Sequence, residues 1–345
     1  MNAPLRGSTV VVTGASSGVG RAAALAYAEA GASLVLAARG EDALELVAEA
    51  CRARGADVLA VRTDVGEAAE VVQLSQAAMT RFGRIDVWAN VAGIGAVGGF
   101  VEVPLDQHVQ VIKTNLLGYL HGAHAALRCF ERQGAGTLIN INSVGGFAAA
   151  PYAVAYGASK FGVRGLSLAL RSELANNPDI QVCEVYGSFL DTPGLAHAAN
   201  YSGRKLRPVP PVNDPERVAK VMVELALKPR PEVMLDLPAR GIRLGSVALP
   251  RVASWSLGRL YEAYVALAER APITPGATFN AGPAPGAVHG GLRSVPLRAL
   301  GASAVLAGLA AVSLAVRARR RRGRLQAEPP GRASKAPGQM PLAAD

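Results

Sequence analysis

Short apolar runs alternate with longer amphipathic stretches over the first two-thirds of this 345-residue chain. The runs are continuous in Val, Leu and Ile, which is typical of parallel strands buried on both faces of a sheet. We predict strands at residues 9–13, 33–38, 57–62, 85–90, 136–142, 180–186 and 232–236. Helical patterns lie between them, near residues 18–31, 41–54, 67–82, 105–132, 152–176 and 214–228. This alternation predicts an α/β fold: a doubly wound parallel sheet of about seven strands with helices on both faces.

A glycine-rich turn follows the first predicted strand. Residues 13–20 read Thr-Gly-Ala-Ser-Ser-Gly-Val-Gly and lead directly into the first predicted helix. Glycines let a backbone approach a pyrophosphate closely, and a helix N-terminus offers free N–H groups and the positive end of its dipole. The order of strand, glycine turn and helix is the one that a dinucleotide site needs, so we expect the sheet to be Rossmann-like. A tight turn whose glycines serve packing alone is the alternative.

Four polar residues further along the chain can make one proton-transfer site. Tyr156 and Lys160 are four residues apart, so both side chains lie on one face of a helix. Tyrosine exchanges a proton usefully only if its pKa falls from about 10 toward neutrality, and a nearby lysine cation favours the phenolate. Ser143 and Asn115 lie upstream of this pair. A decorated, exposed helix face is the alternative for the tyrosine–lysine pair taken alone.

Together these motifs resemble those of the short-chain dehydrogenase/reductase family. The resemblance covers about residues 5 to 238, and six short motifs occur in the family's order. The matching residues are Thr13-Gly14-x-x-x-Gly18-x-Gly20, Asp64-Val65, Asn90-Val91-Ala92-Gly93, Asn115, Ser143 and Tyr156-x-x-x-Lys160.

The resemblance implies a role for each of the four polar residues. Tyr156 would be the general acid/base, and Lys160 would lower the tyrosine pKa and bind the nicotinamide ribose. Ser143 would hold the substrate oxygen, and Asn115 would order a water molecule in a proton relay. One stretch departs from the family pattern, because Gly187-Ser188 stands where Pro-Gly is usual, although the expected threonine, Thr192, is in place.

The end of the second predicted strand bears on the choice of cofactor. It reads Ala38-Arg39, with no carboxylate to hold a ribose 2′-hydroxyl and with an arginine that can accommodate a 2′-phosphate. We therefore predict NADP as the cofactor, with NADPH preferred over NADH. With the glycine turn and Arg39, the family resemblance implies the following cofactor contacts: Gly14, Ser16, Ser17, Gly18, Val19, Gly20, Arg39, Asp64, Val65, Asn90, Ala92, Gly93, Tyr156, Lys160 and Thr192.

Cysteine and histidine positions give no metal-binding pattern. Cys51, Cys129 and Cys183 are far apart in the sequence and odd in number, so we expect buried, reduced thiols. His121 and His124 share one predicted helix without a carboxylate or cysteine motif beside them, and we predict no metal site.

The net charge of +10 comes mostly from one region near the C-terminus. Residues 293–324 contain eight arginines and no acidic residue, and residues 325–345 are balanced. The rest of the chain is therefore close to neutral, which argues against a nucleic-acid-binding surface.

Beyond the family resemblance the chain divides into four further segments. We predict a catalytic domain at 1–238, followed by a helical extension at 239–270. The extension either covers a lipophilic substrate or faces a membrane; the alternative is that it packs on the catalytic domain or on a second subunit. A Pro/Gly/Ala-rich linker follows at 271–292. Residues 293–324 would form a membrane helix with a basic flank, and 325–345 a disordered tail.

The membrane prediction is based on residues 299–316, which carry no charge. Eighteen residues are near the minimum for spanning a bilayer core of about 30 Å. The arginines that follow residue 316 should stay on the cytoplasmic side of the membrane. With a single span, the catalytic domain would then lie on the opposite side. Its cofactor and the absence of a secretory signal instead favour a cytoplasmic catalytic domain. The tail therefore either spans the membrane against the charge rule or lies on an anionic surface.

From these observations we predict a cytoplasmic oxidoreductase that transfers a hydride between NADP(H) and an apolar carbonyl/alcohol substrate. We also expect a homo-oligomer. Two alternatives remain at this point: a non-catalytic nucleotide-binding scaffold on the same fold, and an enzyme similar to the nucleotide-sugar epimerases and dehydratases.

Overall fold

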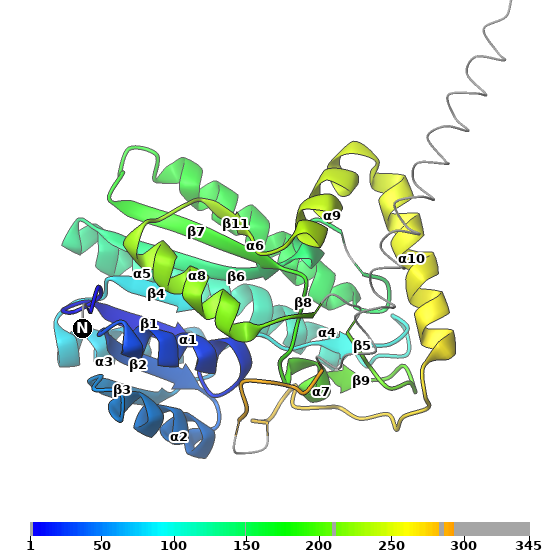
Figure 1. The fold of residues 1–345 in the computed structure, drawn as a ribbon, viewed down its shortest axis with the longest axis horizontal. Helices are drawn as coiled ribbons and strands as arrows, with labels where there is room; N and C mark the ends of the chain where they lie inside the picture. Colours follow the sequence, from blue (N-terminus) through cyan, green and yellow to red (C-terminus); the bar gives the residue numbers. More distant parts are fainter. Residues whose placement is uncertain (1–2, 149, 209–211, 283–285, 293–345) are drawn as a thin grey trace, which may run out of the picture. The chain divides into compact units, whose positions relative to one another are not determined.

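The computed structural model describes residues 3–148, 150–208, 212–282 and 286–292. Within them, seven parallel strands form the central sheet in the order β11-β7-β6-β4-β1-β2-β3 (Figure 1). The strands are β1 (Thr9–Thr13), β2 (Ser33–Ala38), β3 (Val58–Arg62), β4 (Val87–Asn90), β6 (Gly136–Ser143), β7 (Ile180–Gly187) and β11 (Glu232–Met234). All neighbouring pairs in this sheet are parallel. The predicted α/β class and the seven strands are confirmed.

Helices cover both faces of this sheet. One hydrophobic core joins the sheet to α1 (Gly18–Glu29), α2 (Glu41–Arg52) and α8 (Pro215–Leu227). The other joins it to α3 (Ala68–Phe82), α5 (Gly118–Gln133) and α6 (Val154–Glu173). A helical layer on each face explains why the strands are apolar throughout instead of alternating with polar residues.

Strand β1 illustrates this two-sided burial. Val10 and Val12 pack into the core beneath α1, whereas Val11, which points to the opposite face, packs into the core beneath α3 and α5. All three side chains are fully buried. Burial of this size contributes roughly 1.5–3 kcal/mol for each such side chain, so a polar substitution on either face of β1 would weaken the fold.

The chain order reverses next to β1, and this reversal locates the site. From β1 the chain builds outward through β2 and β3, and then returns to place β4 on the other side of β1. In open α/β sheets ligands bind at such a switch point, outside the carboxyl ends of the strands. The turns after β1 and β4 therefore face each other across the expected cofactor site.

The structure differs from the predicted elements in several local details. The single helix expected at 105–132 is α4 (Leu105–Ile112) and α5, joined by one π-helical turn at Lys113–Leu117. Two additional pairs of two-residue strands were not predicted, because runs this short have no detectable period. They are β5 (Ala96–Val97) with β9 (Ala199–Asn200), and β8 (Phe189–Leu190) with β10 (Val212–Asn213); a short helix, α7 (Gly194–His197), lies nearby.

The C-terminal extension is helical and lies beside the turn that follows β6. It consists of α9 (Leu237–Ala248) and α10 (Pro250–Leu267). The Asp236 carboxylate caps α9 by accepting a hydrogen bond from the Ala239 N–H at 2.7 Å. The Tyr261 ring of α10 stacks on Tyr152 with centroids 4.9 Å apart, and the guanidinium of Arg243 lies over the Phe147 ring.

The predicted membrane segment, 293–324, and the predicted tail, 325–345, lie outside the described residues. Among the helices of the described part, none has both the length and the apolar character needed to cross a bilayer.

Candidate cofactor and active site

The turn between β1 and α1 is built for close backbone contact. Gly14 has a φ of +67°, and a Cβ on it would lie 2.7 Å from the Cα of Ala92 in the turn after β4. A Cβ on Gly20 would lie 2.1 Å from the carbonyl oxygen of Gly14. Neither space admits a side chain, so these glycines let the β1 and β4 turns touch and let α1 begin against the turn.

A cavity lies over this turn and extends to the ends of β2, β3 and β4. It brings together twelve of the fifteen cofactor contacts that we expect from the sequence. These twelve are Gly14, Ser16, Ser17, Gly18, Val19, Gly20, Arg39, Asp64, Val65, Ala92, Gly93 and Thr192. Asn90, Tyr156 and Lys160 do not line this cavity.

Asn90 differs from its expected place because its side chain is buried beneath the cavity. Its Oδ1 accepts a hydrogen bond from the Trp88 indole at 2.9 Å. Its Nδ2 donates to the Tyr119 carbonyl at 3.2 Å and to Asn140 Oδ1 at 2.9 Å. A buried amide with its donors and acceptor satisfied fixes the backbone around it. Asn90 therefore holds the end of β4 in place, and the residues that follow it line the cavity.

Arg39, the residue expected to select the cofactor, lies at the rim of this cavity and is held by the C-terminal part of the chain. Its Nη1 donates to the Thr278 carbonyl and its Nη2 to the Ala277 carbonyl, both at 2.8 Å. Burial lowers the pKa of Arg39, whereas the nearby Asp64 carboxylate raises it. Two of its five N–H donors are engaged in this way, which leaves three for a ligand.

Residues 277–282 and 286–292, which we call the strap, run past the glycine turn. The Gly18 N–H donates to the Ala287 carbonyl at 2.8 Å, and the Arg21 guanidinium donates to the Gly286 carbonyl. A Cβ on Gly286 would lie 2.0 Å from the Ser16 carbonyl oxygen. The strap therefore lies directly against the turn that we expect to bind phosphate, within the stretch predicted to be a linker.

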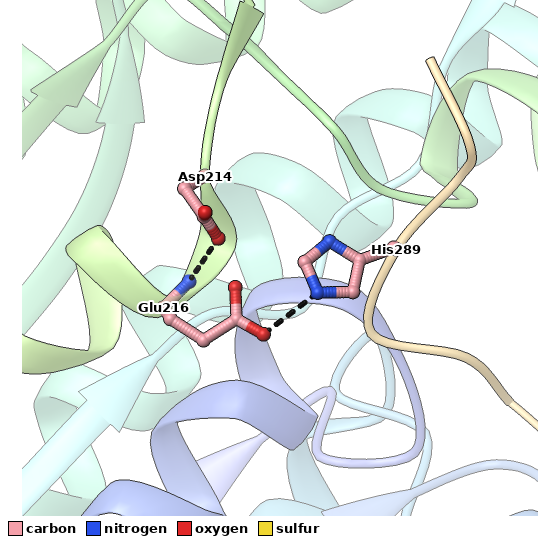
Figure 2. A group of neighbouring side chains, drawn as sticks. All are labelled: Asp214, Glu216 and His289. Atoms are coloured by element: carbon pink, nitrogen blue, oxygen red, sulfur yellow. Dashed lines mark hydrogen bonds and ion pairs between the residues drawn. The ribbon is translucent and has the colours of Figure 1, made fainter. Parts of the chain in front are cut away.

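The far end of the strap is attached through Asp191 and a small acidic group. Asp191 Oδ1 accepts hydrogen bonds from the backbone N–H groups of Gly290 and Leu292 at 3.1 and 2.7 Å. His289 Nε2 lies 2.8 Å from Glu216 Oε1 (Figure 2). Burial raises the pKa of Glu216, and a hydrogen bond with Asp214 raises it further. Among the described residues, Asp214, Glu216 and His289 lie close enough together to hold a metal ion. Their contacts with one another and with the strap already account for this arrangement.

The four polar residues expected to carry out proton transfer come together at the end of β6. Ser143 is the last residue of β6, Tyr156 and Lys160 lie on α6, and Asn115 lies in the π-helical turn before α5. The hydroxyls of Ser143 and Tyr156 lie close enough for Ser143 to affect the pKa of Tyr156. Ser143 Oγ also accepts from the Gly145 N–H at 3.1 Å, which orients it.

Lys160 is almost fully buried beneath the tyrosine. Its Nζ donates to the Ile141 carbonyl at 2.9 Å and lies 4.9 Å from the centroid of the Tyr119 ring and 5.8 Å from that of Tyr156. Burial lowers the pKa of Lys160 to about 8, while the Glu184 carboxylate raises it. At neutral pH the lysine is therefore mainly protonated.

The tyrosine itself does not show the lowered pKa expected from the sequence. Burial raises the pKa of Tyr156, and the nearby Ser143 hydroxyl offsets only part of that rise. The physical reason is geometric, since the ammonium group lies against the ring face and donates to a backbone carbonyl. In this arrangement Tyr156 is held as a neutral phenol, which is a proton donor.

Asn115 is fully buried, and its amide is used by neighbouring groups. Its Oδ1 accepts from the Ile94 N–H at 2.8 Å, and its Nδ2 donates to the Ile94 carbonyl at 2.9 Å and to Ser159 Oγ at 3.3 Å. The residue thus joins the π-helical turn to the loop after β4 and to α6. A π-helical turn interrupts the regular helical bonding and is frequent at functional sites.

The departure from the family pattern also has a structural account. The Ser188 hydroxyl donates to Asp236 Oδ2 at 2.7 Å and accepts from Asn213 Nδ2 at 2.9 Å. A Cβ on Gly187 would lie 3.1 Å from Leu235. The serine therefore ties the end of β7 to the start of α9, and Thr192 reaches the cavity beyond it.

The cysteines and histidines considered above lie elsewhere. All three cysteines are buried and unpaired, as expected. His121 Nδ1 lies 2.9 Å from the Val65 carbonyl, and His124 is exposed.

The strap is the part of the cavity that the sequence did not indicate. Its Pro, Gly and Ala composition carries no binding motif, and its contacts with Arg21 and Arg39 join residues more than 230 positions apart. Only its position in the fold identifies it.

Comparisons with known proteins agree with this geometry. The model of the short chain dehydrogenase family matches residues 8–201. The chain is 29% identical over 330 residues to YxnA of Bacillus subtilis, named an uncharacterized oxidoreductase, with 91% of this chain and 92% of that protein covered.

Two solved structures share the fold. A short chain dehydrogenase/reductase from Burkholderia phymatum in complex with NAD has a TM-score of 0.64 at 28% identity, over 72% of this chain and 96% of that one. An alcohol dehydrogenase from the archaeon Thermococcus sibiricus, complexed with 5-hydroxy-NADP, has a TM-score of 0.58 at 29% identity, over 66% of this chain and 95% of that one. The family model spans more than half of the chain, and both structures share its fold. The protein therefore belongs to the short-chain dehydrogenase/reductase family and is an NAD(P)-dependent oxidoreductase.

Proposed function

We propose that the protein transfers a hydride between NADP(H) and an apolar carbonyl/alcohol pair, with Tyr156 as the general acid/base. The observation that carries this proposal is the grouping of the Tyr156 and Ser143 hydroxyls, which lie close enough to affect the tyrosine pKa, above the buried Lys160 ammonium. Both oxygens can then reach the same substrate oxygen. When bound, the nicotinamide supplies or accepts the hydride at the substrate carbon.

In the reducing direction the chain's own residues handle the proton. The Ser143 hydroxyl donates a hydrogen bond to the carbonyl oxygen and orients it. The Tyr156 phenol gives its proton to that oxygen as the new C–H bond forms, which leaves a phenolate on the enzyme. The Lys160 cation stabilises this phenolate, so its benefit is greatest after the proton has moved. Oxidation of the alcohol follows the same steps in reverse.

The surroundings of Arg39 support NADP as the cofactor. No acidic residue stands at the end of β2 to hold a ribose 2′-hydroxyl, and the carbonyls of Ala277 and Thr278 fix the guanidinium at the cavity rim. Ser16 and Ser17 line the same cavity. One of the two similar structures contains NAD and the other contains 5-hydroxy-NADP. The proposed preference of this chain for NADP over NAD therefore depends on its own Arg39.

Apolar side chains on the C-terminal extension support an apolar substrate. Leu237, Leu244 and Val247 of α9 are 69–76% exposed, and Trp255 of α10 is 67% exposed. These helices lie next to the turn that carries Phe147 and Tyr152, shortly after Ser143. A bound apolar molecule would remove part of this surface from water.

We further propose that residues 299–316 and the arginines behind them attach a cytoplasmic enzyme to a membrane. The support is the uncharged run of eighteen residues followed by a basic cluster. The predicted homo-oligomer stays a prediction.

Replacement of Tyr156 by Phe tests the proton donor. The variant keeps the ring and loses only the hydroxyl, so we expect turnover to fall by about 10²-fold or more, the scale of lost acid–base catalysis. NADPH affinity, measured by fluorescence titration, should persist. A Tyr156→Phe enzyme with nearly full turnover would remove Tyr156 from the reaction.

Replacement of Arg39 by Ser tests the cofactor choice. A charged hydrogen bond contributes about 1.5–3 kcal/mol, so the variant should bind NADPH about tenfold or more weakly while its NADH affinity changes little. Calorimetric titration with both cofactors measures this difference. Equal losses for NADPH and NADH would show that Arg39 acts on the fold instead.

Replacement of Gly286 by Ala tests the relation between the strap and the cofactor. The added methyl would collide with the Ser16 carbonyl and move the strap away from the Gly18 N–H. This donor would then be free for a cofactor pyrophosphate, and a net hydrogen bond of about 0.5–1.5 kcal/mol predicts Kd values two- to tenfold lower for NADH and NADPH alike. The matched control is Gly245→Ala in α9, where a Cβ meets no atom within 4 Å. Weaker binding of both cofactors would mean that the strap is part of the site.

Truncation of the tail tests membrane attachment. The cut belongs after Leu292, because a cut near Gly282 would also remove the strap residues that Asp191 holds. The full-length protein should sediment with membranes, and the truncated one should stay in the supernatant with its activity intact. High salt should release a surface-bound tail but not a spanning one. Full-length protein that stays in the supernatant without detergent contradicts the proposal.

A further inference from the structure

A fully buried carboxylate, that of Glu184, lies behind the active site and has no part in the proton transfer described above. Glu184 occupies the middle of β7, directly beside Asn140 of β6. A buried carboxylate is costly unless neighbouring donors satisfy it. Such a group in the centre of a sheet therefore calls for a specific set of partners.

The first partner is Asn142, which connects Glu184 to two residues of the proton-transfer site. Asn142 Nδ2 donates to Glu184 Oε1 at 2.6 Å and to the backbone carbonyl of Lys160 at 3.1 Å. Asn142 Oδ1 accepts from the Ser143 N–H at 2.8 Å. Since a backbone N–H can only donate, this last bond fixes which end of the amide points to Glu184. One side chain thus spans from the carboxylate to both Ser143 and Lys160.

The charged and titratable groups around this carboxylate come from α6, from β11 and from β7 itself. Arg171 of α6 lies 3.9 Å from Glu184 Oε2 and 3.5 Å from Glu232 of β11. The Tyr186 hydroxyl lies close enough to influence the carboxylate, but among the described residues neither this hydroxyl nor Glu184 Oε2 has a hydrogen-bond partner. Burial raises the pKa of Glu184, and the Glu232 carboxylate adds to that rise; the bond from Asn142, the nearby Tyr186 hydroxyl and the charge of Arg171 offset only part of it. Asn142 and Arg171 are therefore the groups that favour the charged carboxylate.

Lys160 lies on the other side of this group. The titratable groups that face it are Tyr119, Tyr156 and Glu184, and Glu184 is the one that raises its pKa against the effect of burial. Without that carboxylate the ammonium would have two ring faces and the Ile141 carbonyl as its surroundings. A buried lysine with such neighbours loses its proton more readily.

We propose that Glu184, acting through Asn142, is a positioning residue of the active site: it keeps Lys160 charged and holds the backbone of Lys160 and Ser143 in register. The inference rests on the proposed function, in which the charge of Lys160 stabilises the Tyr156 phenolate. This role explains why a buried position carries an acidic residue, since an apolar side chain of similar size would be at least as stable there if only packing mattered.

Glu184→Gln is the direct test, because it keeps the shape and the oxygen that accepts from Asn142 while it removes the charge. The chain contains six lysines, so ¹³Cε labelling of lysine gives a simple NMR spectrum in which Lys160 can be assigned by Lys160→Arg. We expect the Lys160 pKa, about 8 in the unaltered protein, to fall by about one pH unit in Glu184→Gln. Turnover of acetophenone with NADPH should then change little at pH 6 and fall about fivefold at pH 8, where the lysine loses its proton.

Two further variants make the result specific. Glu232→Gln, the matched control, removes an equal charge beside the same Arg171 but makes no contact with Asn142, and should leave the Lys160 titration unchanged. Asn142→Ala removes the donor that favours the Glu184 carboxylate, and should lower the Lys160 pKa in the same direction. It also serves as the test if Glu184→Gln does not fold.

An unchanged Lys160 titration in Glu184→Gln or in Asn142→Ala would overturn the inference. Its failure is separable from that of the proposed function. If Tyr156→Phe abolishes turnover while the Glu184 and Asn142 variants titrate like the unaltered protein, only the positioning role is lost. If Tyr156→Phe retains turnover, the proposed function itself is wrong, whatever the lysine titration shows.

Discussion

The close contact between the turns after β1 and β4 determines where the rest of the site can lie. The Thr13 hydroxyl bridges the two strands by donating to the Ala89 carbonyl and accepting from the Val91 N–H. One residue later, Gly14 packs against the backbone of Ala92 with no room for a Cβ. This contact closes the floor of the cavity at the point where the strand order reverses. It also sets the start of α1, whose N–H groups then face the cavity, and the rim formed by Arg39 and Asp64 follows from the neighbouring strands.

A second constraint is the burial of charge beside the reaction centre. Lys160 and Glu184 lie in the protein interior on adjacent elements, where each would be unfavourable without hydrogen-bond partners. The Ile141 carbonyl accepts from Lys160 and the Asn142 amide donates to Glu184, and both residues belong to β6, next to the strand β7 that carries Glu184. The two central strands thus support the chemistry as well as the core. The tyrosine is left as a neutral phenol beside a cation, which suits a group that must first give up a proton and then bear a negative charge.

Sequence predicted much of this because the relevant signals are local. Strand bounds such as Thr9–Thr13 and Ser33–Ala38 agree with the apolar runs, because a strand that is buried on both faces is apolar at nearly every position. Glycine spacing and the Tyr156–Lys160 interval likewise arise within a few residues. What could not be predicted depends on contacts between distant segments: the buried position of Asn90, the raised pKa of Tyr156 and the contact of the strap with Arg39. A composition rich in Pro, Gly and Ala does not distinguish a solvent-exposed linker from a segment that packs against a cavity.

The central claim, hydride transfer coupled to proton donation by Tyr156, is tested most directly by isotope transfer. The protein is incubated with NADPH deuterated at C4 of the nicotinamide, in separate experiments for each face, and with acetophenone or a longer aryl ketone. Mass spectrometry of the alcohol should find one deuterium on the carbinol carbon from one face only, and Tyr156→Phe should form this deuterated alcohol about 10²-fold or more slowly. Alcohol formed without deuterium from either face, or no alcohol from any ketone while NADPH binds, would contradict the account.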